Sequence, residues 1–166
     1  DKVFSVNVIS GGDPLEIYTD REGEVIFKKY SPIGELASFA AQYAETLHKT
    51  CSLSVVICDR DAVIACAGVP RKEYTDKALS QELEEIIEGR SLYVRREDAP
   101  ALPVLADHSA HGVRCAMPII SEGDVLGCVA SVGEGDTDPQ HRSPIGEVET
   151  KLILTAAGFL GRQLET

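Results

Sequence analysis

Residues 113–132 read VRCAMPIISEGDVLGCVASV, two apolar runs joined by the polar sequence SEGD. A glycine-containing turn between runs rich in valine, isoleucine and small apolar residues predicts an antiparallel hairpin, with strands at 113–120 and 125–132. Helices expected on both sides of this hairpin in the sequence would have to cover it. We therefore expect an antiparallel sheet that is flanked by helices.

The sequence before this hairpin supplies more of the same sheet. Apolar runs at 54–59 and 62–67 flank a polar turn and predict two strands, and a short strand is expected at 91–94. Between them, one apolar face predicts a helix that ends at Gly89. That face consists of Leu79, Leu83, Ile86 and Ile87.

Two helices with the same start precede and follow the sheet. The sequence SPIGE occurs at 31–35 and again at 143–147, and serine followed by proline is a strong helix start. Apolar residues then recur every three or four positions, as in a helix that packs against another helix. The two stripes are Ile33, Leu36, Ala40, Tyr43 and Leu47, and Ile145, Val148, Leu152, Thr155, Ala156, Phe159 and Gln163. Ala157 and Gly161 add a place where another backbone could approach closely. The order of all these elements predicts an α+β fold.

A further hairpin is expected ahead of the first helix. Residues 15–19 alternate, DREG at 20–23 turns, and residues 24–30 run back. A lone two-stranded hairpin is only marginally stable in water, so this one must pair with something else.

Composition and charge exclude several classes of protein. The chain has 166 residues, with 27 acidic against 16 basic side chains and a formal net charge of -11. Phosphate backbones repel such a chain, so binding of nucleic acid across its whole surface is excluded. The apolar runs are too short to span a bilayer and the start does not read as a signal peptide, so no membrane partner is expected. Five cysteines, four of them in apolar segments, favour reduced thiols and a cytoplasmic location.

Three motifs resemble parts of a known family. Residues 118–127, PIISEGDVLG, are similar to the central hairpin of GAF domains. GDPLEI at 12–17 and GEVIFKKYSP at 23–32 resemble the end of an AbrB-type swapped-hairpin DNA-binding domain. GEVE at 146–149 and TAAGFLGRQLE at 155–165 resemble the last helix of the stage V sporulation protein T family.

The resemblance implies both a fold and a function. Members of the family join an AbrB-type half to a C-terminal GAF-like domain, dimerise through the first and last helices of the latter, and regulate transcription in the forespore. We therefore expect residues 1–30 to be a remnant of an AbrB-type domain and residues 31–166 to be a GAF-like sensor and dimerisation domain. The chain would be the regulatory part of a sporulation transcription regulator, a homodimer or higher homo-oligomer, and not an enzyme. Ligand occupancy would shift the helix bundle by changing the populations of two arrangements.

The first ten residues depart from the family. DKVFSVNVIS stands where the family has a strand, a Gly-Arg-aliphatic segment and an arginine-rich helix, and no arginine precedes Arg21. Lys28 and Lys29 add only two charges, which would give weak, salt-sensitive binding. We expect DNA to be bound only through an AbrB-type half, if the intact protein has one, and not specifically by this chain alone.

Candidate ligand residues lie before the central hairpin. GAF domains bind ligands between the sheet and this connection, which the resemblance places at residues 95–115. An unknown small molecule with a negative charge would suit the arginines there, with the histidines as adaptable partners. The expected ligand-binding residues are Arg95, Arg96, His108, His111, Arg114 and Cys115.

Two alternatives stay open. One is a cysteine-dependent GAF-fold reductase of free methionine sulfoxide, in which Cys66, Cys115 and Cys128 would line one pocket. A reactive thiol needs a nearby cation that lowers its pKa, and Arg114 is the obvious candidate. The other is a purely structural dimerisation module. The loosely spaced histidines and cysteine at 107–115 do not match a zinc site. No metal, cofactor or catalytic residue is expected.

Overall fold

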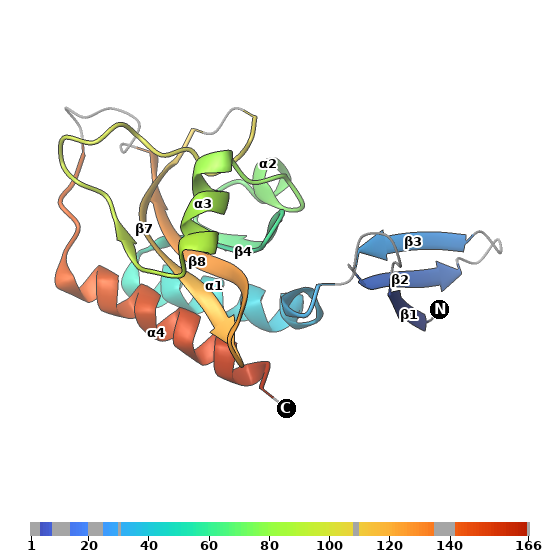
Figure 1. Cartoon of the computed structure of the whole chain (residues 1–166). Helices are drawn as coiled ribbons and strands as arrows, with labels where there is room; N and C mark the ends of the chain where they lie inside the picture. Colours follow the sequence, from blue (N-terminus) through green and yellow to red (C-terminus); the bar gives the residue numbers. More distant parts are fainter. Residues whose placement is uncertain are drawn as a thin grey trace.

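The computed structural model describes residues 4–7, 14–19, 25–29, 31–107, 110–134 and 142–165 (Figure 1). Its elements are β1 (Phe4–Asn7), β2 (Pro14–Thr19), β3 (Val25–Lys29), the 3-10 helix η1 (Ile33–Leu36), α1 (Ala37–Cys51), β4 (Ser54–Asp59), β5 (Val63–Ala67), α2 (Arg71–Tyr74), α3 (Gln81–Gly89), β6 (Tyr93–Val94), β7 (Gly112–Ser121), β8 (Asp124–Gly133) and α4 (Glu147–Gln163). The strands form two antiparallel sheets, one of three strands and one of five. The predicted α+β fold class is confirmed.

The smaller sheet has the order β1-β2-β3. The hairpin expected before the first helix is confirmed as β2 and β3, with Ile17 opposite Phe27. β1 is the further partner that a lone hairpin requires, and it places Phe4 opposite Ile17 on the other side. Its sequence pattern did not reveal it, because polar residues interrupt the short apolar run.

The larger sheet has the order β5-β4-β8-β7-β6, and its longest pairing is the hairpin of β7 and β8. This is the hairpin predicted at 113–132. Glu122 has φ 52° and Gly123 has φ 86°. Two successive positive φ values are typical of a two-residue type I′ turn, whose twist matches that of the paired strands.

Each face of the larger sheet has its own apolar core. Along β4, Val55 and Ile57 belong to the core under α1 and α4, whereas Val56 and Cys58 belong to the core under α2 and α3. Helix α1 packs on β4 and β5, and α4 packs on β7 and β8. The two long helices therefore share one face of the sheet, and α3 covers the other (Figure 1).

Gly161 allows α4 to approach the sheet closely. A β-carbon added at Gly161 would lie 2.4 Å from the carbonyl oxygen of Ile120 in β7. The close backbone approach expected around Ala157 and Gly161 is therefore confirmed at Gly161, and the neighbouring backbone is the chain's own sheet.

The two SPIGE segments fold differently. Ser31 caps η1, because the N–H of Gly34 donates to Ser31 Oγ at 3.2 Å, and the chain then continues into α1. At the second copy, α4 begins only at Glu147. The prediction that Ser143 starts this helix is wrong, because its hydroxyl and carbonyl oxygens accept hydrogen bonds from arginine side chains instead.

Candidate functional site

The structure brings three of the predicted ligand residues together beside the start of α4. Arg95 directly follows β6, and Arg114 and Cys115 lie in β7; all three are buried. The N–H of Arg95 donates to the carbonyl of Arg114 at 2.8 Å, so the pairing of β6 with β7 aligns the two arginines. Cys115 belongs to the core under α1 and α4.

The other predicted residues do not join this group. His111 is buried against α2, where its Nδ1 lies 2.8 Å from the hydroxyl oxygen of Tyr74. The two rings meet edge to face, with centroids 5.6 Å apart. Arg96 is exposed. His108 lies outside the described residues, and the six residues as a ligand site stay a prediction.

A β-bulge directs Arg114 toward α4. Val113 lies opposite Val132 and Cys115 lies opposite Ser131, so Arg114 is the extra residue between two paired positions. A bulge of this kind bends the strand and re-aims a side chain. It lets the Arg114 side chain reach the first turn of α4.

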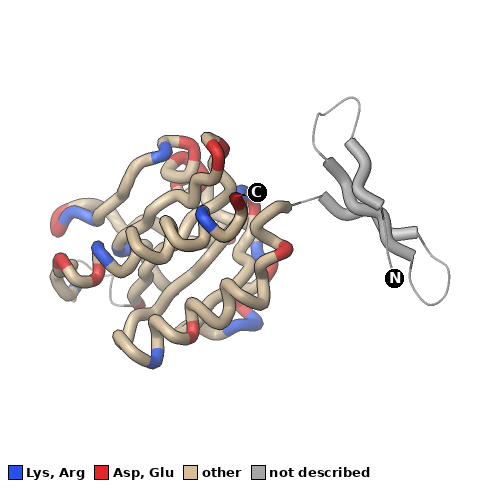
Figure 2. Tube along the Cα trace, turned by 90° about the horizontal axis from the view of Figure 1, so that it is seen from below, with Lys and Arg blue, Asp and Glu red and all other residues tan. Residues whose placement is uncertain are grey.

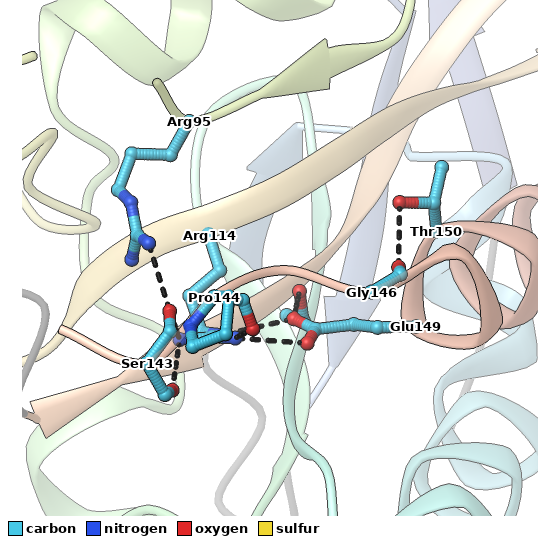
Figure 3. Close-up of polar contacts among 8 residues, drawn as sticks. Arg95, Arg114, Ser143, Pro144, Gly146, Glu149 and Thr150 are labelled. Carbon is cyan, nitrogen blue, oxygen red and sulfur yellow. Dashed lines mark hydrogen bonds and ion pairs between the residues drawn. The ribbon is translucent and has the colours of Figure 1, made fainter. Parts of the chain in front are cut away.

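Arg114 and Glu149 form a buried two-pronged ion pair (Figure 3). Arg114 Nε donates to Glu149 Oε2 at 2.9 Å, and Arg114 Nη2 donates to Oε1 at 3.0 Å. Ser131 Oγ in β8 donates to Oε2 at 2.7 Å. Glu149 lies in the first turn of α4, where the helix dipole also favours a negative charge. The ion pair therefore fixes the beginning of α4 against β7 and β8.

The same arginines hold the segment that leads into α4. Arg95 Nη2 donates to the Ser143 carbonyl at 2.9 Å, and Arg114 Nη1 donates to Ser143 Oγ at 2.9 Å (Figure 3). Arg114 Nη2 also donates to the Pro144 carbonyl at 3.1 Å. We call Arg95, Arg114, Ser143 and Glu149 the arginine clasp. It joins β6, β7, the segment before α4 and α4 itself.

Burial and charge determine the protonation of the clasp. Burial acts to raise the pKa of Glu149, but hydrogen bonds from Arg114 and Ser131 and the charge of Arg114 outweigh it, so that the pKa is lowered. Burial, followed by the nearby charge of Arg114, lowers the pKa of Arg95. Glu149 is therefore a carboxylate at neutral pH, and the clasp is held by charge-assisted hydrogen bonds.

The cysteines do not form the pocket that a reductase would need. Cys66 and Cys128 belong to the core under α2 and α3, whereas Cys115 belongs to the core under α1 and α4. The hypothesis that they line one pocket is wrong, because the sheet separates them. Burial raises the pKa of Cys115 to about 11, so its thiol is protonated at neutral pH despite the adjacent Arg114.

A cluster of partly exposed apolar side chains lies on the outer side of α1 and α4. The rings of Phe39 and Phe159 stack with centroids 5.7 Å apart, and the ring of Tyr43 lies 5.6 Å from that of Phe159. Phe39 is 36% exposed, Phe159 is 40% exposed, and Val148, on the same side of α4, is 72% exposed. We call these four residues the apolar strip. A cluster of exposed apolar side chains is a candidate interaction surface.

The part of the chain that the structure describes shows neither a metal-ligand cluster nor a membrane-spanning helix. There, His, Cys, Asp and Glu side chains nowhere gather in a group of three that could hold a metal ion. Among the helices of the same residues, none combines the length and hydrophobicity that a membrane span requires.

Comparisons with known proteins agree with the family resemblance. Residues 35–165 match the family model described as stage V sporulation protein T C-terminal, transcription factor. The chain is 44% identical over 161 residues to stage V sporulation protein T of Bacillus subtilis (strain 168), which covers 95% of this chain and 84% of that protein.

Two solved structures of GAF-domain proteins match the chain. A GAF domain/HD domain protein from Geobacter sulfurreducens matches with a TM-score of 0.51 at 16% identity, over 80% of this chain and 91% of that one. The cofactor-binding GAF domain of the nutrient sensor CodY from Clostridium difficile matches with a TM-score of 0.48 at 14% identity, over 75% and 83% of the two chains. The first match confirms the expected GAF-like fold.

Proposed function

The chain belongs to the stage V sporulation protein T family, and on that basis we propose that it is the dimer-forming, ligand-responsive part of a transcription regulator that acts in sporulation. The family model that it matches is described as a transcription factor, which supports the regulatory role. A transcription regulator of this kind acts on DNA in the cytoplasm. The finer parts of the proposal, the dimer and its response, rest on the geometry of α1 and α4.

The apolar strip is the observation that carries the proposal. Residues 37–44 of α1 and 152–161 of α4 contain no charged side chain. Figure 2, which draws uncharged residues in tan, shows long tan stretches along the helices on this side of the sheet. Sheet contacts occupy the inner sides of both helices, so their outer sides are available to a second copy of the chain. A two-fold dimer would bring two strips together and form a four-helix bundle.

The two parts of the chain would have different roles. Residues 1–30, with the sheet of β1 to β3, would be the remnant of the AbrB-type half, and any specific contact with DNA would need that half in full. Residues 31–166 would be the sensor and dimerisation domain. The dimer would then fix the spacing of two DNA-binding heads, as symmetric regulators require.

The strip can be tested by placing a charge in it. Phe159→Glu is expected to weaken self-association by about 100-fold, because a buried aromatic contact of this kind typically contributes about 2–4 kcal/mol. Sedimentation velocity of the full chain over a range of concentrations measures the change. Gln81→Glu is the matched control, because Gln81 is exposed at the start of α3, on the other face of the larger sheet, and its replacement adds the same charge.

Two results would contradict the dimer. The unmodified chain could sediment as a monomer at micromolar concentration. Alternatively, Phe159→Glu could associate as strongly as the control variant Gln81→Glu. Circular dichroism of both variants establishes that a loss of association is not a loss of fold.

The arginine clasp offers a route from ligand to dimer. Of the predicted residues, Arg95 and Arg114 are the two that would bind an anionic group, and Arg114 already holds Glu149. An anionic ligand at Arg114 would compete with Glu149 and loosen the first turn of α4, which contains Val148 of the apolar strip. The ligand would act by binding one of two arrangements of α4 more tightly than the other.

A purely structural dimerisation module is the alternative. It would keep the dimer but have no anionic ligand. Thermal unfolding of the full chain in the presence of small anionic metabolites separates the two, because only a ligand that binds the folded state raises the melting temperature.

A further inference from the structure

Two buried thiols lie side by side on neighbouring strands of the larger sheet, outside both the clasp and the apolar strip. Cys58 in β4 lies directly opposite Cys128 in β8. Their sulfur atoms are 3.1 Å apart, and neither residue is exposed. All five cysteines are free thiols.

The backbone explains why the thiols meet. Gly127, next to Cys128, lets β8 approach β4 closely, because a β-carbon there would lie within 1.9 Å of the Cys58 carbonyl oxygen. Cys58 Sγ also lies 3.6 Å from the carbonyl oxygen of Cys128. The surrounding core is apolar, with Val56, Val63 and Ala130 as neighbours, so each thiol has the other as its polar partner.

We propose that Cys58 and Cys128 are an oxidative modification site, at which a peroxide converts the two thiols into a disulfide that joins β4 to β8. This inference goes beyond the proposed function and does not depend on it. It requires no metal and no other cofactor.

The chemistry balances with one peroxide molecule. The thiolate of one cysteine attacks an oxygen of hydrogen peroxide, the O–O bond breaks, and a sulfenic acid and a hydroxide form. The second sulfur attacks the sulfenic sulfur, an S–S bond forms, and the S–O bond breaks to release hydroxide. The two thiol protons neutralise the two hydroxides. Two thiols and one peroxide thus give one disulfide and two water molecules; the sulfurs lose two electrons and the peroxide oxygens gain them.

The position of the pair makes the first step, formation of the sulfenic acid, slow and the second step, formation of the disulfide, fast. The hydrogen bond with Cys128, and then burial, raise the pKa of Cys58, so little thiolate is present at neutral pH. Access comes from the end of the strand, where Asp59 and Gly127 form the last pair of β4 with β8 and the register of β4 with β5 shifts after Ile57. Local opening at such strand ends admits a molecule as small as peroxide. Once a sulfenic acid forms, the partner sulfur lies beside it, so oxidation stops at the disulfide.

The test uses the full chain carrying Cys51→Ser, because Cys51 is partly exposed and could link two chains. Hydrogen peroxide is expected to remove two hydrogen atoms (about 2 Da) per chain. Peptide mapping should then find Cys58 joined to Cys128. The cross-link spans 70 residues of sequence, so it should raise the melting temperature by roughly 5–15 °C, and dithiothreitol should reverse the shift.

The controls separate this pair from the other buried thiols. Cys58→Ser and Cys128→Ser should each abolish the mass loss and the shift in melting temperature, whereas Cys66→Ser should change neither. Peptide mapping of the chain with both cysteines in place decides the matter even if a serine variant fails to fold. The proposal is overturned if the chain gains oxygen without losing hydrogen, if another pair of cysteines is linked, or if no reaction occurs within hours at millimolar peroxide.

Discussion

Replacing Arg114 with methionine is expected to lower the free energy of unfolding by about 3–5 kcal/mol, as is typical when one partner of a buried ion pair is removed. The Glu149 side chain is 11% exposed, and in this variant it would lose both hydrogen bonds from Arg114 and keep the one from Ser131. The contacts of Arg114 with Ser143 and Pro144 would be lost as well. Urea unfolding of the full chain, followed by circular dichroism, measures the change.

An exposed ion pair in the same helix provides the control. Lys151 and Glu147 lie 3.0 Å apart with side chains 71% and 79% exposed. Lys151→Met is expected to cost less than about 1 kcal/mol, because water and salt screen such pairs. The double variant Arg114→Met with Glu149→Leu should recover much of the loss, since no buried charge is left unpaired. If Arg114→Met costs no more than Lys151→Met, the clasp does not hold α4.

The same ion pair gives the stability of the chain a defined pH dependence. The pKa of Glu149 in the folded chain lies below its ordinary value of 4.5. The carboxylate therefore contributes its full stability above that value and loses it as the pH falls through the lower pKa of the folded state. The difference in unfolding free energy between the unmodified chain and Glu149→Gln should be constant from about pH 7 to 5 and shrink in more acidic solution. A difference that already shrinks above pH 5 would mean that burial, and not Arg114, dominates the pKa.

The parts of the fold that short-range signals determine could be predicted from the sequence. The hairpin at 113–132 follows from its turn, because a Glu-Gly pair at positive φ suits a type I′ connection. α2 was missed because its four residues, Arg71–Tyr74, are too few to display a helical period. The second SPIGE segment was misassigned for a different reason. The same five residues cap a helix at Ser31 but not at Ser143, because Arg114, 29 residues away, takes the oxygens of Ser143.

The candidate site was predictable only in part, because it too depends on contacts between residues that are far apart in the sequence. The sequence marks Arg95 and Arg114 as candidate residues for an anionic ligand, from their place before and within the central hairpin, but does not indicate that they are buried. Glu149 was noted only as part of a helix motif, and its pairing with Arg114 depends on a bulge that no sequence pattern signals. An acidic residue in the first turn of α4 was the one available signal, and it also has a local explanation in the helix dipole.

Gly127→Ala is expected to destabilise the chain by about 3 kcal/mol or more, at the upper end of what added volume costs in a packed core. An alanine β-carbon would lie 1.9 Å from the carbonyl oxygen of Cys58 and 2.8 Å from the Cα of Asp59. Both atoms belong to the backbone of β4, which is paired on its other side with β5, so neither can move aside as a flexible side chain would. The melting temperature should fall by roughly 6–12 °C, measured by circular dichroism.

Gly158→Ala is the matched control for this variant, because it adds the same methyl group where nothing lies within 4 Å. Gly158 lies within α4 and is exposed, so alanine should stabilise the helix by about 1 kcal/mol and raise the melting temperature by a few degrees. Opposite signs for the two variants would establish that contact between β4 and β8, and not the loss of glycine as such, is what the sheet requires at Gly127. A melting temperature of Gly127→Ala within about 2 °C of the unmodified chain would mean that β4 and β8 can separate at little cost. In that case the close approach of the two strands would not hold Cys58 and Cys128 in contact.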